Sequence, residues 1–120
     1  MEDNRQEQIE ALEILKDFNE KLLHNIPILV KELSGERLDD TDKFLKGVID
    51  AMNWEIGVMN GTLSLLNEGE ERINKEEFNK CVIAISEAYK AKDDAKLAAA
   101  FRTVQPYFEK LGAAAMAVTE

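Results

Sequence analysis

The stretch that decides the fold is residues 93–118, DDAKLAAAFRTVQPYFEKLGAAAMAV. Its large apolar side chains recur at alternating spacings of four and three residues, which keeps one seam of an α-helix facing its neighbours in a bundle. Asp93 or Asp94 is placed to cap the start of this helix, and Pro106 is expected to bend it. The predicted seam consists of Leu97, Phe101, Val104, Phe108, Leu111, Ala115 and Val118.

The preceding segment carries the clearest helix start in the chain. Asn74 is an N-cap residue, and Glu77 follows three residues later to return the hydrogen bond. The flanking pair Ile73 and Phe78 has the spacing of a hydrophobic staple. A very short turn at residues 91–92 joins this helix to the next, which predicts an antiparallel hairpin. The predicted buried face of the helix that begins after Asn74 is Phe78, Val82, Ile85 and Tyr89.

The first part of the chain predicts a long amphipathic helix from about Asn4 to Leu33. Pro27 interrupts this pattern, because proline cannot donate to the preceding turn and its ring crowds that turn. Either the helix kinks there or a new helix starts near Pro27. Residues 34–35, Ser-Gly, supply the stop. The apolar face is Ile9, Leu12, Leu15, Phe18, Leu22, Ile26, Leu29 and Leu33.

A second helix is predicted to begin after Leu38, with Asp39 or Asp40 as its N-cap, and to end near Asn67 before Gly69. Two adjacent apolar stripes make this helix the expected buried centre of the fold. They are Leu45, Val48, Met52, Ile56, Met59, Leu63 and Leu66, and beside them Phe44, Gly47, Ala51, Trp54, Val58, Gly61 and Leu65.

Three glycines of that helix, Gly47, Gly57 and Gly61, each lower helix propensity by about 1 kcal/mol relative to alanine. Such losses predict that a neighbouring backbone comes close. No segment shows the alternation typical of a strand. The sequence therefore predicts an all-α fold in a single domain over residues 1–120. We expect an antiparallel bundle of three to four long helices, the first kinked or split near Pro27 and the fourth bent near Pro106.

The charge of the chain restricts its partners. It holds 24 acidic and 15 basic residues, for a formal net charge of -9. Residues 1–72 contain 17 acids against 8 bases, whereas the remainder is balanced. A surface of this sign repels phosphate backbones and anionic lipid headgroups, and no run of about 18 apolar residues is available to span a bilayer. We expect neither nucleic acid nor membrane as a partner.

Cys81 is the only cysteine, so an intrachain disulfide is excluded, in agreement with a reducing compartment. The start of the chain lacks the basic and apolar regions of a signal peptide. A cytoplasmic location is therefore expected. His24 is the only histidine, and nothing near it suggests a nucleophilic triad. The Glu-x-x-His pattern of a di-metal bundle fails at Lys21, and phosphate-binding glycine loops are absent. We expect no catalytic residues, no metal and no cofactor.

The most distinctive candidate is a polar edge on the second predicted helix, which includes three asparagines at intervals of seven. It reads either as a hydrogen-bonding strip beside a groove for a partner helix or as a solvent strip on an otherwise buried helix. The edge is Asp50, Asn53, Gly57, Asn60, Ser64 and Asn67, flanked by Trp54 and Met59. The candidate partner-binding residues are Asp50, Asn53, Trp54, Gly57, Met59 and Asn60.

Residues 54–63, WEIGVMNGTL, together with the later run from Lys92 through Leu97 and Phe101 to residues 106–109, PYFE, resemble an uncharacterised family of small bacterial α-helical proteins. The resemblance extends over about residues 44–110 and implies no catalytic residues. In layout the chain is similar to flagellar and secretion export chaperones, which hold the helical tail of a partner.

The expected function is that of a protein-interaction module that binds a partner helix, or a second copy of itself, through apolar helix faces. The alternative is a small-ligand-binding or enzymatic bundle with a pocket between its helices. The acidic first part would select basic or neutral partners.

Overall fold

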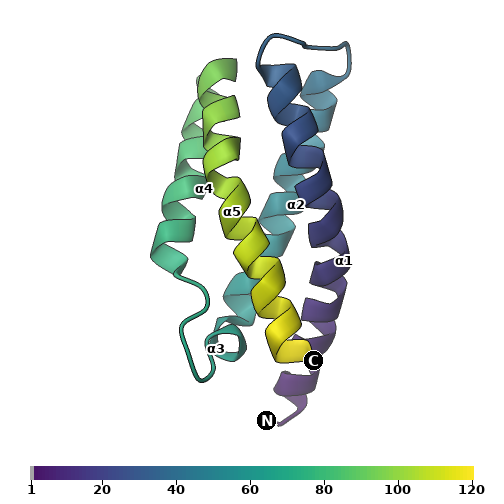
Figure 1. The fold of residues 1–120 in the computed structure, drawn as a ribbon, viewed down its shortest axis with the longest axis vertical. Helices are drawn as coiled ribbons and strands as arrows, with labels where there is room; N and C mark the ends of the chain where they lie inside the picture. The colour runs from purple at the N-terminus through teal and green to yellow at the C-terminus, as the bar shows by residue number, and fades with distance from the viewer. Residues whose placement is uncertain (1) are drawn as a thin grey trace.

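The computed structural model describes residues 2–120, with side chains from Asn4 onward, and over that range it contains helices and no strand. The bundle measures 48 × 24 × 19 Å (Figure 1). The predicted all-α bundle is confirmed. The helices are α1 (Glu2–Leu33), α2 (Thr41–Gly61), the single turn α3 (Leu63–Leu66), α4 (Lys75–Lys90) and α5 (Asp94–Thr119).

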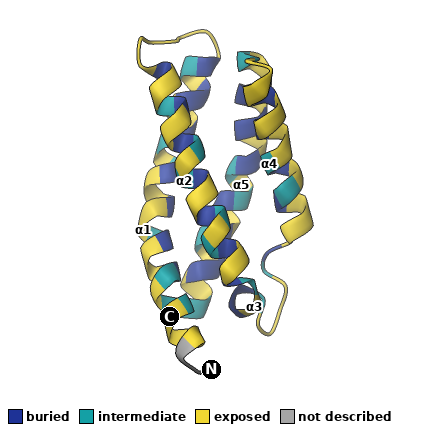
Figure 2. Cartoon of the chain, turned by 180° about the vertical axis from the view of Figure 1, so that it is seen from behind, coloured by how far each residue is buried: buried dark blue, intermediate teal, exposed yellow. Residues whose placement is uncertain are grey.

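Two helical hairpins, α1–α2 and α4–α5, are joined chiefly along α1 and α5. The closely packed order is therefore α2, α1, α5, α4, and the buried faces all point inward (Figure 2). The expectation that the second helix forms the centre is wrong, because α2 packs mainly against α1. The central position belongs to α5, whose small buried residues Ala98, Ala100, Ala114 and Ala115 let its two neighbours come close.

The helix starts of the second hairpin follow the prediction. The Asn74 side chain accepts a hydrogen bond from the Glu77 backbone N–H at 3.1 Å, and Asp93 accepts one from the Lys96 N–H at 3.0 Å. Ile73 is buried, as is the aromatic ring that follows the cap. These caps satisfy backbone N–H groups that have no partner within their own helix.

The start of α2 uses a different device from the predicted aspartate cap. Asp40 occupies the N-cap position, but its side chain makes no capping hydrogen bond. The buried hydroxyl of Thr41 instead accepts from the Leu38 N–H at 2.8 Å and donates to Glu32 Oε1 at 2.7 Å. This pair of bonds ties the start of α2 to the end of α1.

Both prolines lie inside helices. Pro27 lies within α1, which continues to Leu33, so the alternative of two separate helices is wrong. Pro106 likewise lies inside α5. Both are exposed, where water can satisfy the carbonyl that proline leaves free. A kink at either position stays a prediction. The predicted stop after α1 is confirmed, since Gly35 adopts φ 117°.

The second helix ends earlier than predicted, at Gly61 and not near Asn67. Thr62 is the cause, because its hydroxyl donates to the Val58 carbonyl at 2.7 Å and its φ of -120° leaves the helical region. The chain then makes the single turn α3, which buries Leu65 and Leu66.

The loop between α3 and α4 is organised by one side chain. Asn67 Oδ1 accepts from the backbone N–H groups of Arg72 and Ile73, each at 2.9 Å, and its Nδ2 donates to the Ile73 carbonyl at 3.1 Å. Gly69, within this loop, has a φ of 85° that glycine adopts readily. Asn67 therefore has a structural role and is not part of a free polar edge.

The glycine prediction is wrong for α2. A Cβ built at Gly47, Gly57 or Gly61 meets nothing within 4 Å, since all three lie on the exposed face. The close approach occurs at Gly112 of α5, where an added Cβ would collide with the side chain of Asn19 from α1. The tight contact lies between the two central helices.

Several predicted core positions are exposed instead. Phe18 is 46% exposed and Trp54 41% exposed, and Tyr89 also lies at the surface while Val82 is half-buried. In α4 the smaller side chains of Cys81 and Ala88 complete the buried face with the two predicted residues Phe78 and Ile85. The seam predicted for α5 is buried from Leu97 to Ala115.

Candidate interaction surface and buried polar layer

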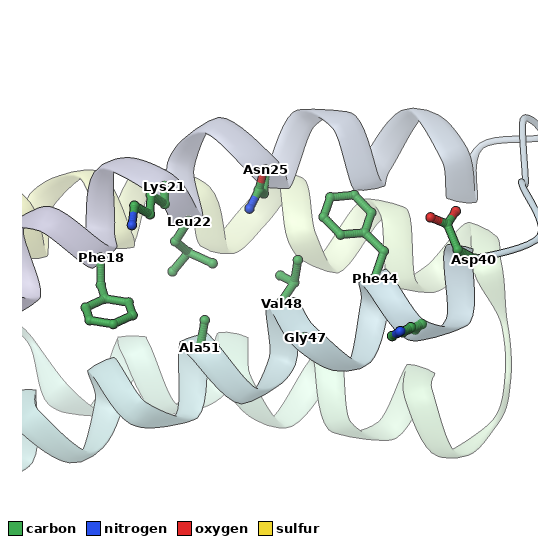
Figure 3. A pocket seen from close by; sticks show the side chains of 10 residues that line it. Phe18, Lys21, Leu22, Asn25, Asp40, Phe44, Gly47, Val48 and Ala51 are labelled. Carbon is green, nitrogen blue, oxygen red and sulfur yellow. The ribbon is translucent and has the colours of Figure 1, made fainter.

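A groove of about 590 Å³ runs between α1 and α2, and we call it the α1–α2 groove (Figure 3). Its floor is apolar, whereas amide, ammonium and carboxylate groups stand at its rim. The groove extends along residues 40–51, which include the N-cap of α2, and residues 18–25 of α1 line its other side. The lining residues are Phe18, Lys21, Leu22, Asn25, Asp40, Lys43, Phe44, Gly47, Val48 and Ala51.

Two exposed aromatic side chains stand at one end of this groove. The rings of Phe18 and Trp54 have centroids 4.9 Å apart and are inclined at 44°, and we call them the aromatic pair. Lys21 Nζ lies 5.8 Å from the centroid of the Phe18 ring, within cation–π range. The pair joins the outer edges of α1 and α2 and presents a large apolar area to solvent.

The rim of the groove carries charges of both signs. Lys21, Lys43 and Asp40 line it, with Lys21 and Asp40 at opposite ends (Figure 3). Farther along α2, Lys46 Nζ pairs with the Asp50 carboxylate at 2.9 Å, which raises the pKa of the lysine. The groove is thus less acidic than the chain as a whole, and one of its two ammonium groups, that of Lys21, already lies over an aromatic ring.

The structure separates the predicted partner-binding residues into two groups. Asp50, Asn53, Gly57 and Asn60 are exposed along the outer side of α2, as a polar edge requires. Met59 is fully buried and does not belong to this surface. Trp54 is exposed, but it lies against Phe18 of the neighbouring helix.

A fully buried carboxyl group follows Trp54 in the sequence of α2. Glu55 is 0% exposed, and neither of its carboxylate oxygens has a hydrogen-bond partner among the described residues. Because burial disfavours the charged form, the pKa of Glu55 rises to about 8. A carboxyl group in this environment holds its proton at neutral pH. The sequence analysis missed it, although its spacing of seven from Val48 and four from Met59 continues the buried seam.

Asn19 of α1 is the other buried side chain with an unpartnered polar atom among the described residues. Its Nδ2 donates to the Phe108 carbonyl of α5 at 3.1 Å, while its Oδ1 has no partner among the described residues. Asn19 follows Phe18 in α1, and Glu55 follows Trp54 in α2. We call these two buried residues, Asn19 and Glu55, the polar layer.

A second hollow of about 530 Å³ lies between α2 and the α4–α5 turn. Three of its charged groups are paired, because Arg37 bonds Asp94 Oδ2 at 2.6 Å and Asp42 Oδ1 at 2.8 Å. The arginine holds the pKa of Asp94 below its usual range. These bonds hold the α1–α2 loop against α2 and α5, so we interpret this side of the hollow as a structural feature of the fold.

The remaining reactive side chains, one histidine and one cysteine, lie on different helices and do not form a cluster. His24 is exposed on α1, and Cys81 is buried in α4, where burial raises the pKa of its thiol. From Asn4 onward, no three histidine, cysteine, aspartate or glutamate side chains group in a way that could hold a metal ion. No helix within the described range has the length and apolar character that a membrane crossing requires.

The fold and the surface define an all-α helical bundle with an exposed groove and a buried polar layer. Residues 7–114 match the family described as Domain of unknown function (DUF8042), and the chain belongs to this family. This agrees with the uncharacterised family expected from the sequence. Comparison with curated proteins found no match, and comparison with solved structures found none either.

Proposed function

We propose that this protein is an interaction module whose α1–α2 groove binds an amphipathic helix of a partner protein. The observation that carries the proposal is the aromatic pair at the end of an apolar groove. Phe18 is 46% exposed and Trp54 is 41% exposed. Adjacent helices with an apolar groove are a recurring means of binding a third helix.

The aromatic pair can supply much of the binding free energy. Covering the exposed part of each ring removes roughly 100 Å² from water, which contributes about 2 kcal/mol per ring. Aromatic side chains in such positions dominate many protein interfaces. The polar edge with Asn53 and Asn60 lies on the same helix and would form the solvated rim of the interface.

Charge favours a partner over self-association. Each copy carries a net charge of -9, so two copies repel one another, whereas a neutral or basic helix is attracted. We therefore propose a partner segment with an apolar face and few acids. By layout, we propose a role like that of export chaperones, in which a bacterial cytoplasmic protein holds the helical tail of its partner.

Fluorescence of Trp54, the only tryptophan, tests the proposal directly. Two synthetic 18-residue helices with the same leucine pattern, one with lysine and one with glutamate on the polar face, are titrated into the protein. We expect micromolar binding of the lysine helix and at least tenfold weaker binding of the glutamate helix.

A matched pair of variants locates the binding. Phe18→Ala is expected to weaken binding at least tenfold, while Ile83→Ala, which removes a 55% exposed side chain on the distant α4, leaves it unchanged. Equal losses in the two variants, or no change in either, would refute the α1–α2 groove as the binding surface. Because both positions are exposed, each variant is expected to keep the wild-type circular dichroism spectrum.

One observation favours the alternative of a ligand-binding bundle over a pure interaction module. Glu55 and Asn19 leave three buried side-chain oxygens without a hydrogen-bond partner among the described residues, which an apolar docking surface does not need.

A further inference from the structure

We propose that the second hollow, between α2 and the α4–α5 turn, binds a small organic acid that carries one carboxylate on a flat apolar body. Lys90 and Lys92 would hold the carboxylate, and the body would lie on Leu45 and Leu97. This site shares no lining residue with the α1–α2 groove, and it goes beyond the proposed function because its ligand is a small molecule and not a partner helix.

The second hollow lies where both hairpins close at the same end of the bundle. Figure 1 shows the α1–α2 loop and the α4–α5 turn together at that end. Arg37, Leu45, Tyr89 and Leu97 line the hollow from the loop, α2, α4 and α5, respectively. Both leucines are buried members of the apolar core, so the hollow reaches down to the core. Its volume of about 530 Å³ is in the range of small-molecule sites.

The charge of this hollow is opposite in sign to that of the chain. Three basic and two acidic side chains line it, for a net charge of +1, whereas the whole chain carries -9. Arg37 already holds both acids, Asp42 and Asp94. Lys90 and Lys92 have no ion pair among the described residues. Two ammonium groups of the hollow are therefore available to an anion.

Lys92 stands at a position where the fold alone favours glycine. Its φ of 54° is left-handed, and its N–H donates to the Tyr89 carbonyl at 3.1 Å. The N–H of Asp93 donates to the Ala88 carbonyl at 3.1 Å, which completes the hydrogen-bond pattern of a helix end that usually contains glycine. A side chain is unfavourable in this conformation, and that of Lys92 forms no ion pair in return. A ligand-binding role accounts for the lysine.

Tyr89 supplies a wall for the apolar body of the ligand. Its ring is 43% exposed and lines the hollow above the two leucines of the core. Asp50 and Tyr89 both raise the pKa of Lys46, so the tyrosine lies within electrostatic range of α2. A flat body that covers this ring and the leucines removes apolar surface from water. This apolar floor favours an organic acid over an inorganic anion.

The head group that fits best is a single carboxylate. Its oxygens accept hydrogen bonds, and an ammonium group offers three N–H donors, so each bond between them is charge-assisted. One negative charge also balances the net charge of the hollow. A phosphate monoester brings a second negative charge next to Asp42 and Asp94, where it is repelled.

The test uses the full chain and three naphthalene probes that differ in their head group: 2-naphthoate, 2-naphthamide and 2-naphthyl phosphate. Calorimetry at neutral pH measures their binding. We expect 2-naphthoate to bind about tenfold more tightly than the amide, because its bonds to the lysines are charge-assisted. Equal affinity for the acid and the amide would overturn the proposal. Tighter binding of the phosphate would overturn the assignment of a single carboxylate.

Lys92→Gly separates ligand binding from folding, because the two are expected to change in opposite directions. Glycine adopts the left-handed conformation readily, so the thermal midpoint should rise by about 2–5 °C. The same variant should bind 2-naphthoate about tenfold more weakly, since one ammonium group is lost. Undiminished binding in Lys92→Gly would refute the role of this lysine.

A matched pair on α4 distinguishes the site from general electrostatics. Lys90→Ala should weaken 2-naphthoate binding about tenfold, whereas Lys80→Ala, about 15 Å away along the same helix, should leave it unchanged. Neither lysine has an ion pair among the described residues, so the two variants differ only in position. Equal losses in both would show that the acid responds only to overall charge.

Nuclear Overhauser effects in the wild-type protein locate the probe without any variant. Contacts from the naphthyl protons to the methyl groups of Leu45 and Leu97 support the site. Contacts only to residues of the α1–α2 groove, such as Val48, exclude it. That result leaves the proposed helix binding unaffected, because the two surfaces have no lining residue in common.

Discussion

Asn19 of α1 fills the space that a side chain at Gly112 of α5 would occupy. The Asn19 Nδ2 atom donates to the Phe108 carbonyl at 3.1 Å, and a Cβ at position 112 would collide with that same nitrogen. Asn19 can therefore adopt this position only because residue 112 is a glycine. The contact lies in the interface between the two most extensively packed helices.

Replacing Gly112 with alanine is expected to destabilise the protein by about 1–3 kcal/mol, because Asn19 must give up its hydrogen bond inside the core. The control is Gly57→Ala in α2, where the new methyl meets nothing within 4 Å. There we expect a gain of about 0.5–1 kcal/mol from helix propensity. Urea denaturation of the two variants should give changes of opposite sign, and a gain in both would contradict the packing described.

The stability of the protein should fall as pH rises from about 4.5 to 8. Below this range Glu55 is protonated in both folded and unfolded chains, whereas within it the unfolded chain loses the proton and the folded chain keeps it. Above pH 8 both forms are ionised and the loss is complete, on the order of 5 kcal/mol.

Glu55→Gln should remove this contribution, so its free energy of unfolding relative to wild type increases between pH 5 and pH 9. Glu109→Gln serves as the control because it lies at an exposed position. Urea midpoints across the pH range measure both differences, and a constant offset for Glu55→Gln would show that Glu55 does not titrate in this window.

Arg37 joins three parts of the fold, because it lies in the α1–α2 loop and bonds Asp42 of α2 and Asp94 of α5. The side chain is 40% exposed, so solvent screens these pairs. Arg37→Ala should cost about 0.5–1 kcal/mol at low salt and less at 1 M salt. Lys46→Ala, which removes a pair within one exposed helix, should leave the thermal midpoint unchanged. An Arg37→Ala effect that salt does not reduce would exclude an electrostatic origin.

The exposed asparagines of α2 should behave differently from the capping asparagine of α4. Asn74→Ala removes the acceptor of the Glu77 N–H and is expected to cost about 1 kcal/mol. Asn60→Ala lies at an exposed position inside α2 and should be neutral or slightly stabilising. Thermal unfolding measures both. A large loss in Asn60→Ala would mean that the polar edge holds the fold together.

Local sequence signals predicted the second hairpin well, because its caps and its apolar seam act within one or two turns. Asn74 and Asp93 cap the helices as their positions suggested, and the seam from Leu97 to Ala115 is buried. Periodicity was less informative for α2, where apolar residues on two stripes pointed to a central helix. One stripe contains Trp54, which remains exposed beside Phe18.

The polar layer could not be predicted from composition, because a glutamate is normally assigned to a solvated face. Only the register of Glu55 with Val48 and Met59 signals its burial. The close contact at Gly112 depends on which helices become neighbours, and a single sequence does not specify that pairing. The aromatic pair likewise joins residues 36 positions apart, beyond the reach of any local pattern.

The pairing of α1 with α5 also sets the order in which the chain can bury its surfaces during synthesis. Until residues 94–119 have left the ribosome, the inner face of α1, with Leu12 and Leu15, lacks its main cover. Newly synthesised α1–α2 hairpins therefore expose apolar surface to solvent until α5 is available to cover it. Slow translation of the α5 region would lengthen this period, in which the hairpins are prone to aggregate.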